Sequence, residues 1–235
     1  FSSRRRHTRY GTVTGVQTCA LPICHNPTVT PDDATIDAWI EAVRQGGWQR
    51  LRTSALAPAA ADVLMRHGFR VRQELEFLSL DLDGADTTVR NAVRWRIGSV
   101  RASVAVGLDI AAFGDEWAMD DAALDHALHA TRDRRLVAVR RRGSPPFARP
   151  IGFCLTGASD DSAYLQRLAV VPTARRAGAA HTLVADAIAW AGSAGARRIF
   201  VNTDVDNAAA LSLYERWGFV PVGFHLRVLE RDLAT

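Results

Sequence analysis

The sequence predicts an α/β protein in which helices flank a central β-sheet. Residues 164–171 form a short apolar run closed by Pro172, and an alanine-rich helical pattern follows from Gly178. Residues 197–203 form a second apolar run, and a second helical pattern begins at Asn207. Strand and helix patterns that alternate along a chain are typical of α/β folds.

The first junction has the composition of an anion-binding site. It reads Arg175-Arg176-Ala177-Gly178-Ala179-Ala180, between the strand and the helix. The first turn of a helix carries unpaired N–H groups and partial positive charge, and small residues let a phosphate reach them. The junction therefore predicts a pyrophosphate site, and an ordinary junction with surface arginines is the alternative. The chain has no lysine, which excludes a Walker loop.

The second junction places a tyrosine near the first. Asn207 and Tyr214 are seven residues apart on the same helix, so they lie on one side of it. Gly218 is expected to end this helix, and Phe219 to begin the last strands. The Tyr214 hydroxyl is predicted to lie beside the reacting group, and the alternative is a core tyrosine with a satisfied hydroxyl.

Together the two motifs resemble the GNAT superfamily of acetyl-CoA-dependent N-acetyltransferases. The order is strand, Arg175-x-x-Gly178-x-Ala180, helix, strand, Asn207-x-x-Ala-x-x-x-Tyr214-x-x-x-Gly-Phe. The resemblance covers residues 89–233 and implies the GNAT fold, with a mixed central β-sheet. It also implies that acetyl-CoA is the acyl donor and a primary amine the acceptor, on a small molecule or a protein N-terminus.

The resemblance assigns roles to individual residues. It implies that Asn207 contacts the cofactor and that Tyr214 protonates the departing CoA thiolate. The edge of the strand at Leu168, Ala169 and Val170 would pair with the pantetheine arm. The pyrophosphate would be held by Arg175, Arg176, Ala177, Gly178, Ala179 and Ala180.

The general base is left open. Ribosomal-protein alanine N-acetyltransferases, which the motif order also resembles, have a glutamate where this chain has Asn202, and an amide cannot accept a proton at neutral pH. Asp204, a chain of water molecules or an amine that arrives uncharged could replace it. The rival functions are transfer of a different acyl group and a non-catalytic acyl-CoA sensor or scaffold.

Residues 1–24 resemble translated sequencing adapter. Residues 3–9 and 13–23 correspond to two segments of a common short-read adapter, and the nine bases for residues 10–12 fit one remaining adapter base and an eight-base barcode between them. Removing the segment lowers the count of Lys and Arg from 29 to 25, against 25 Asp and Glu, so the formal charge of +4 falls to zero. The basic character then gives no support to nucleic-acid binding.

The remaining composition predicts a cytoplasmic, bacterial protein without membrane spans. Once the segment is removed only Cys154 remains, and its apolar surroundings predict a buried strand residue. No disulfide, zinc or other metal framework is expected. Abundant arginine and alanine without lysine suggest a GC-rich bacterial genome.

A partial second GNAT copy is predicted upstream. Residues 48–53 and 60–69 parallel residues 197–203 and 210–219, and both 60–69 and 210–219 end in Gly-Phe. Residues 25–82 are therefore interpreted as the C-terminal half of a degenerate copy, and residues 83–235 as the catalytic domain. The positions of Asn207 and Tyr214 correspond to Ala57 and Leu64, so this copy is expected to be inactive.

Two further helices, at residues 108–117 and 120–131, are expected on the acceptor side. The first would place Phe113 and Trp117 four residues apart. Asp109, Glu116 and Trp117 are candidates for holding an amine. The favoured reading of these residues is instead core aromatics and solvated acids.

Overall fold

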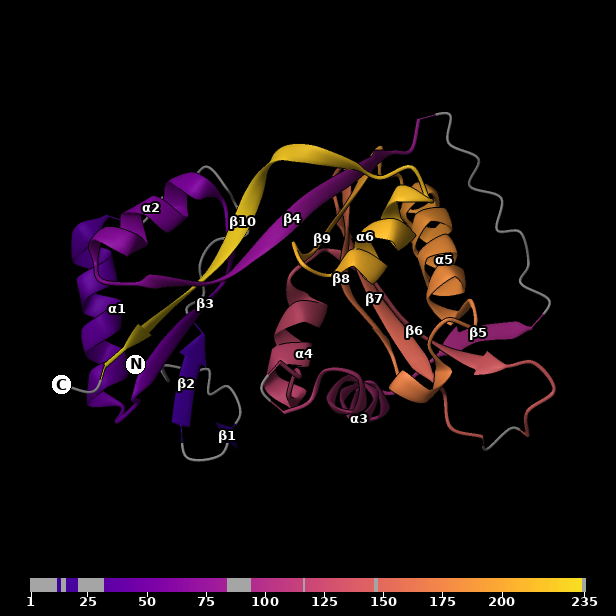
Figure 1. The fold of residues 1–235 in the computed structure, drawn as a ribbon, viewed down its shortest axis with the longest axis horizontal. Helices are drawn as coiled ribbons and strands as arrows, with labels where there is room; N and C mark the ends of the chain where they lie inside the picture. Colours follow the sequence, from indigo (N-terminus) through magenta and orange to yellow (C-terminus); the bar gives the residue numbers. More distant parts are fainter. Residues whose placement is uncertain are drawn as a thin grey trace, which may run out of the picture. The chain divides into compact units, whose positions relative to one another are not determined.

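A computed structural model of the protein describes residues 12–13, 16–20, 32–83, 94–115, 117–145 and 148–233 (Figure 1). The chain divides into two compact units: unit 1 comprises residues 1–76 and 223–235, and unit 2 comprises residues 77–222. The predicted adapter segment lies outside the described residues, except for the short strands β1 (Thr12–Val13) and β2 (Val16–Ala20). Its origin and the predicted boundary at residue 83 stay predictions.

Unit 1 packs two helices against a small sheet. Helices α1 (Asp33–Gln45) and α2 (Pro58–Arg66) bury Ile36, Ile40 and Leu64 against β3 (Arg50–Leu56). Strand β3 is antiparallel to the end of β10 (Val220–Asp232), which lies between β3 and β4 (Arg70–Asp81) in the strand order. The last strand of the chain therefore completes the sheet of its first elements.

His67 links the end of α2 to α1 through two carboxylates. Its Nδ1 and Nε2 each lie 3.0 Å from a carboxylate oxygen, of Asp37 and Asp33 respectively. Only the protonated ring can donate from both nitrogens. The hydrogen bond to Asp33 raises the pKa of His67 above its ordinary value, with Asp37 adding to the effect and burial opposing it.

We expect unit 1 to become less stable as pH rises, because His67 then loses the charge that stabilises it. The stabilisation is fully present below the unfolded-state pKa of 6.5 and is lost as pH rises through the higher folded-state pKa. Urea unfolding should show His67→Gln costing more stability at about pH 6 than at about pH 9. An equal cost at both values would mean that the two carboxylates do not favour the charged ring.

Unit 2 is built on a mixed sheet, as the sequence predicts. The strand order within the unit is β4-β9-β8-β7-β6-β5. Strands β5 to β8 pair antiparallel, whereas β8 and β9 pair parallel. The strands of this unit that follow β4 are β5 (Trp95–Ser99), β6 (Asp133–Arg141), β7 (Gly152–Ser159), β8 (Ser162–Val170) and β9 (Arg198–Asp204).

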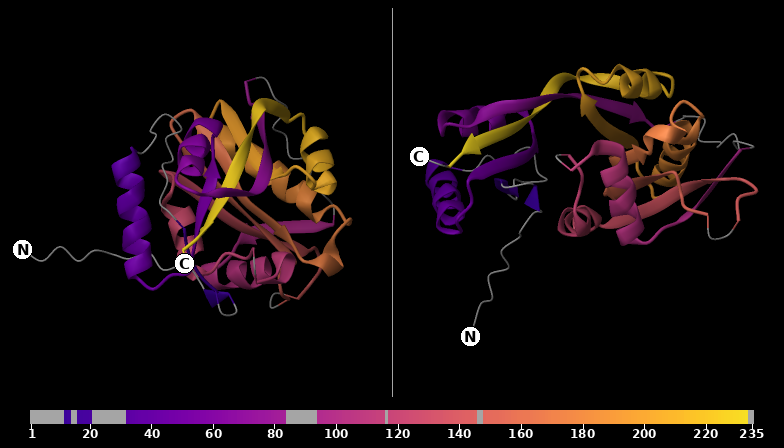
Figure 2. Two further views of the ribbon diagram at one scale, coloured as in Figure 1. Left: turned by 60° about the vertical axis from the view of Figure 1, so that its left-hand side comes forward. Right: turned by 60° about the horizontal axis from the view of Figure 1, so that its bottom comes forward.

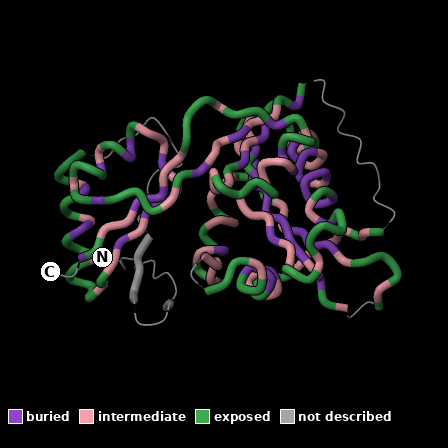
Figure 3. Tube along the Cα trace, viewed as in Figure 1, coloured by how far each residue is buried: buried purple, intermediate pink, exposed green. Residues whose placement is uncertain are grey.

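Helices cover the two faces of this sheet (Figure 1, Figure 2). One face, here called the α5 face, packs against α5 (Ala179–Ser193) and α6 (Ala208–Glu215) through a core that includes Cys154 and Ile199. The opposite α3 face packs against α3 (Ala102–Phe113) and α4 (Asp121–His129) around Phe153 and Leu155. Buried residues accordingly concentrate in the central strands and in α5 (Figure 3).

One predicted helix ends earlier than expected. Helix α3 stops at Phe113 because Gly114 adopts φ +73°, a backbone conformation that glycine tolerates best. Phe113 and Trp117 therefore do not share a helix, and that expectation was wrong. Cys154 is confirmed as a buried strand residue, and burial raises the pKa of its thiol to about 12.

The order strand, helix, strand occurs twice with matching details. β3, α2 and β4 repeat as β9, α6 and β10. Gly68 and Gly218, which follow α2 and α6, adopt φ +79° and +82°. At the position of Tyr214 in the second set, the first has Leu64, which is fully buried. These parallels support a second, degenerate GNAT copy, which stays a prediction.

Candidate functional site

The parallel strands β8 and β9 separate after a short paired stretch. They pair at only three rows, and the last joins Tyr164 to Phe200. Strand β8 nevertheless continues to Val170, and β9 to Asp204. The facing edges beyond Tyr164 and Phe200 form a notch, here called the β8–β9 notch. Backbone groups along such an edge are free to pair with an extended ligand.

The N-terminus of α5 follows directly after β8. Pro172–Ala174 form a single 3-10 turn, and Gly178 caps α5 with φ +87° and without a side-chain hydrogen bond to the helix. Arg176 also has positive φ, +57°, which is uncommon outside glycine and typical of functional loops. The junction therefore presents the first N–H groups of α5 beside residues without bulky side chains.

Trp95 supports this junction, and the sequence analysis did not identify it. Its indole N–H donates to the carbonyl of Ala177 at 3.1 Å. A side chain on Gly178 would come within 3.6 Å of the same ring nitrogen. Trp95 lies 82 residues before Ala177 in the chain, so no local pattern could show the contact.

The two arginines of the junction differ in their surroundings. The guanidinium of Arg175 donates to the carbonyls of Val170 (3.2 Å) and Ala112 (2.8 Å), which joins the junction to the end of α3. Arg176 is exposed to solvent. Arg175 thus has a structural role in the shape of the junction, and phosphate contact by either arginine stays a prediction.

Tyr214 lies in the same core cluster as the junction and the notch. That cluster includes Ala179, and Leu168, Val170 and Ala180 pack against it. Tyr214 is 4% exposed, and its ring packs against Phe219. Burial, together with the neighbouring Cys154 thiol, raises the pKa of Tyr214 well above its ordinary value. The phenol therefore keeps its proton throughout the neutral range.

The remaining predicted residues lie at the edges of the notch. Asn207 is the N-cap of α6 and accepts the N–H of Ala210 at 3.2 Å. Asn202 is exposed near the end of β9. Asp204, the proposed alternative base, accepts the N–H of Asp206 at 2.8 Å. Contact between Asn207 and a cofactor stays a prediction.

Asp109 is not a solvated acid, nor is it available to an acceptor. It is fully buried, and Arg167 on β8 binds its two oxygens at 2.8 and 2.7 Å. Asp109 also accepts the N–H of Met119, and Arg167 donates to the carbonyl of Trp117. This ion pair fixes the α3–α4 segment on β8. Glu116, the third candidate on this side, lies outside the described residues.

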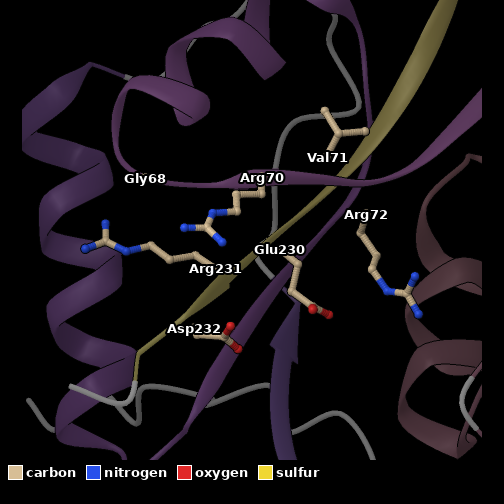
Figure 4. Close-up of a pocket in the computed structure, with 7 residues that line it drawn as sticks. All are labelled: Gly68, Arg70, Val71, Arg72, Glu230, Arg231 and Asp232. Carbon is tan, nitrogen blue, oxygen red and sulfur yellow. The ribbon is translucent and has the colours of Figure 1, made fainter.

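A separate hollow occurs in unit 1, where no site was predicted (Figure 4). Its charged side chains have both signs, and Arg231 donates to the carbonyl of His67. It is lined by Gly68, Arg70, Val71, Arg72, Glu230, Arg231 and Asp232. The mixed charges favour no single ligand.

Two further classes of feature were sought across the described part of the chain. No three or more His, Cys, Asp or Glu side chains gather there as a metal would require. None of the helices described is both long and apolar enough to cross a membrane.

Comparison with known proteins gives matches among families and solved structures. The chain is similar to a GCN5-related N-acetyltransferase from Sphaerobacter thermophilus, with a TM-score of 0.61 and 15% identity over 85% of this chain and 66% of that one. For one from Kribbella flavida the TM-score is 0.59, with 17% identity over 93% and 82% of the two chains. A tandem GNAT protein from the clavulanic acid biosynthesis pathway gives 0.64, with 13% identity over 94% and 77%.

These similarities show the GNAT fold. No curated protein matches the chain. Residues 107–219, which include the junction, the notch and Tyr214, match the family described as Acetyltransferase (GNAT). The family match covers just under half of the chain, and it falls in the part that has the GNAT fold.

Proposed function

We propose that the protein is a cytoplasmic, metal-independent enzyme that transfers the acetyl group of acetyl-CoA to a primary amine. The acceptor amine belongs to a small molecule or a protein N-terminus. One observation carries the proposal: the β8–β9 notch opens beside the uncapped N-terminus of α5, and Tyr214 lies in the same core cluster.

The donor would bind along the notch and across the junction. The pantetheine arm, which contains two amides, suits the backbone edge of β8 at Leu168 and Val170. The pyrophosphate suits the N–H groups at the start of α5, where the helix dipole favours negative charge. Gly178 and Ala179 leave these groups accessible, and Arg176 adds an exposed positive charge nearby.

The chemistry is direct acyl transfer. The nitrogen lone pair attacks the thioester carbonyl, the C–S bond breaks, and the nitrogen loses a proton to water. Backbone N–H groups of β8 stabilise the oxygen anion that forms. Tyr214 donates a hydrogen bond and then its proton to the sulfur, because its phenol is still protonated at neutral pH.

The amine is proposed to react as the free base. The side chain at the usual glutamate position is Asn202, and an amide does not accept a proton. Asp204 is already an acceptor for the backbone of Asp206. Activity would then rise with pH as the acceptor loses its proton.

The donor site is tested by two nearly isosteric changes at Gly178. Asn and Asp are the side chains that best tolerate positive φ, so the two variants strain the backbone to a similar extent and differ mainly in charge. Gly178→Asp adds a negative charge where the pyrophosphate would lie. Calorimetry should show that it weakens acetyl-CoA binding about tenfold or more relative to Gly178→Asn.

Two results would count against this proposal in different ways. Equal binding by the two variants would mean that the N-terminus of α5 does not hold the pyrophosphate. Tight binding without thiol release from any amine would favour an acyl-CoA sensor, a reading that the replacement of the usual glutamate by Asn202 favours.

A further inference from the structure

Three aromatic rings stand side by side where β8 and β9 begin to separate. Phe200 stacks on Tyr164 with ring centres 5.6 Å apart, and on Phe77 of β4 with ring centres 5.3 Å apart. Tyr164 and Phe200 are the last paired residues before the β8–β9 notch. This aromatic row, defined as Phe77, Phe200 and Tyr164, therefore borders the closed end of the notch.

The row lies on the α3 face of the sheet. Phe153 and Leu155 of β7 pack on that face, and alternation along the strand places Gly157 there too. Gly157 is opposite Tyr164, and Tyr164 is opposite Phe200. Tyr214 belongs to the core of the other face. An acyl group lying in the notch would thus meet Tyr214 from one side and the aromatic row from the other.

The row is only partly covered. Tyr164 is 38% exposed, which is unusual for a stacked aromatic in the middle of a sheet. Its pKa is raised, chiefly by partial burial and next by Asp161, so its hydroxyl stays neutral. Tyr164 belongs to the last paired row, so its ring lies at the closed end of the notch.

Gln166 adds an unused hydrogen-bond acceptor at the same place. The pairing of β7 with β8 shifts by one residue, so that Leu155 faces Arg167, Thr156 faces Leu165, and Gln166 forms a bulge between them. Its Nε2 lies 2.9 Å from the position of a Cβ on Gly157, next to Tyr164. Its Oε1 is buried without a partner among the described residues. Such an orphan acceptor costs stability and is typical of a functional position.

Asn202 and Gln166 give the notch a neutral entrance on this side. Each is two residues beyond the last paired row, Asn202 on β9 and Gln166 on β8. A carboxamide oxygen accepts an N–H but offers no full charge to an ammonium ion. The nearby carboxylate of Asp109 is already neutralised by Arg167.

We propose that the aromatic row and Gln166 form the acceptor subsite, and that the acceptor is a primary amine close to a flat, apolar group such as a phenyl ring. This inference rests on the proposed function. The flat group lies against Tyr164 and Phe200, while Gln166 Oε1 accepts an N–H of the uncharged amine. The amine nitrogen is then held at the closed end of the notch.

The test compares two acceptors of similar length, 2-phenylethylamine and n-hexylamine, with kcat/KM expressed per concentration of uncharged amine because the aromatic amine is the weaker base. The full chain is assayed with acetyl-CoA for thiol release. We expect kcat/KM to be at least about tenfold higher for 2-phenylethylamine. Phe200→Leu should reduce this preference to about twofold without changing acetyl-CoA binding. Met65→Leu, at an exposed apolar residue of unit 1, should leave it unchanged.

Gln166→Met separates a binding role from a structural one. Because Gln166 Oε1 has no partner to lose, this variant should unfold at the same temperature or higher. It should nevertheless raise KM for 2-phenylethylamine about fivefold. An unchanged KM, or a preference for n-hexylamine, would overturn the acceptor subsite while thiol release still upheld acetyl transfer. Failure to bind acetyl-CoA would overturn the proposed function itself.

Discussion

Tyr214→Phe should lower kcat by about 100-fold while acetyl-CoA binding stays nearly unchanged. The substitution removes only the hydroxyl, and the ring keeps its packing against Phe219, with ring centres 5.6 Å apart. The buried phenol stays protonated through neutral pH, so its loss removes the proton donor to the thiolate. Steady-state thiol release and calorimetry on the same preparation measure the two quantities.

The pH dependence of the activity gives a second test of Tyr214 as the proton donor. Because burial raises the pKa of Tyr214 above its ordinary value of 10.0, its ionisation should cause no loss of activity below about pH 10.

If Tyr214→Phe loses acetyl-CoA binding together with turnover, Tyr214 is a structural residue. A variant with full turnover would require another donor to the leaving group.

Asp109→Ala should cost about 3 kcal/mol of the free energy of unfolding. It leaves the guanidinium of Arg167, whose side chain is only 23% exposed, without its carboxylate. It also removes the acceptor for the N–H of Met119. Urea denaturation of the wild type and the variant measures the loss.

A paired substitution distinguishes a buried unpaired charge from lost packing. Asp109→Leu combined with Arg167→Met replaces both charges by apolar groups of similar size, and much of the lost stability should return. The cation–π contact of Arg167 with Phe113, at 4.1 Å, is lost in the double variant, so recovery should be incomplete. If the double variant is less stable than Asp109→Ala, the unpaired guanidinium is not the source of the cost.

The sequence predicts those parts of the site that local chemistry determines. Gly178 and the residues around it indicate a helix N-terminus open to anions, and the spacing of Asn207 and Tyr214 follows from helical geometry. The α/β class and the mixed sheet follow from the alternation of strands and helices together with the family resemblance.

The rest depends on contacts between distant residues. Arg167 meets Asp109 across 58 positions, and Trp95 meets Ala177 across 82, so neither pairing leaves a periodic pattern. The bulge at Gln166 appears only once the register of two strands is known. Helix α3 was expected to extend to Trp117 because the apolar spacing continues past Gly114, where the backbone turns away.

The placement of β10 beside β3 has a consequence for biosynthesis. The hydroxyl of Thr53 on β3 accepts the N–H of Leu229 on β10, which lies 176 residues later in the chain. At about 5–20 residues per second, a ribosome needs roughly 10–35 s to make that stretch. During this time the edge of β3 that pairs with β10 stays unpaired beside α1 and α2. An unpaired strand edge can bind chaperones or aggregate. A premature stop codon just before β10 would therefore leave α1, α2 and β3 without the strand that pairs with β3.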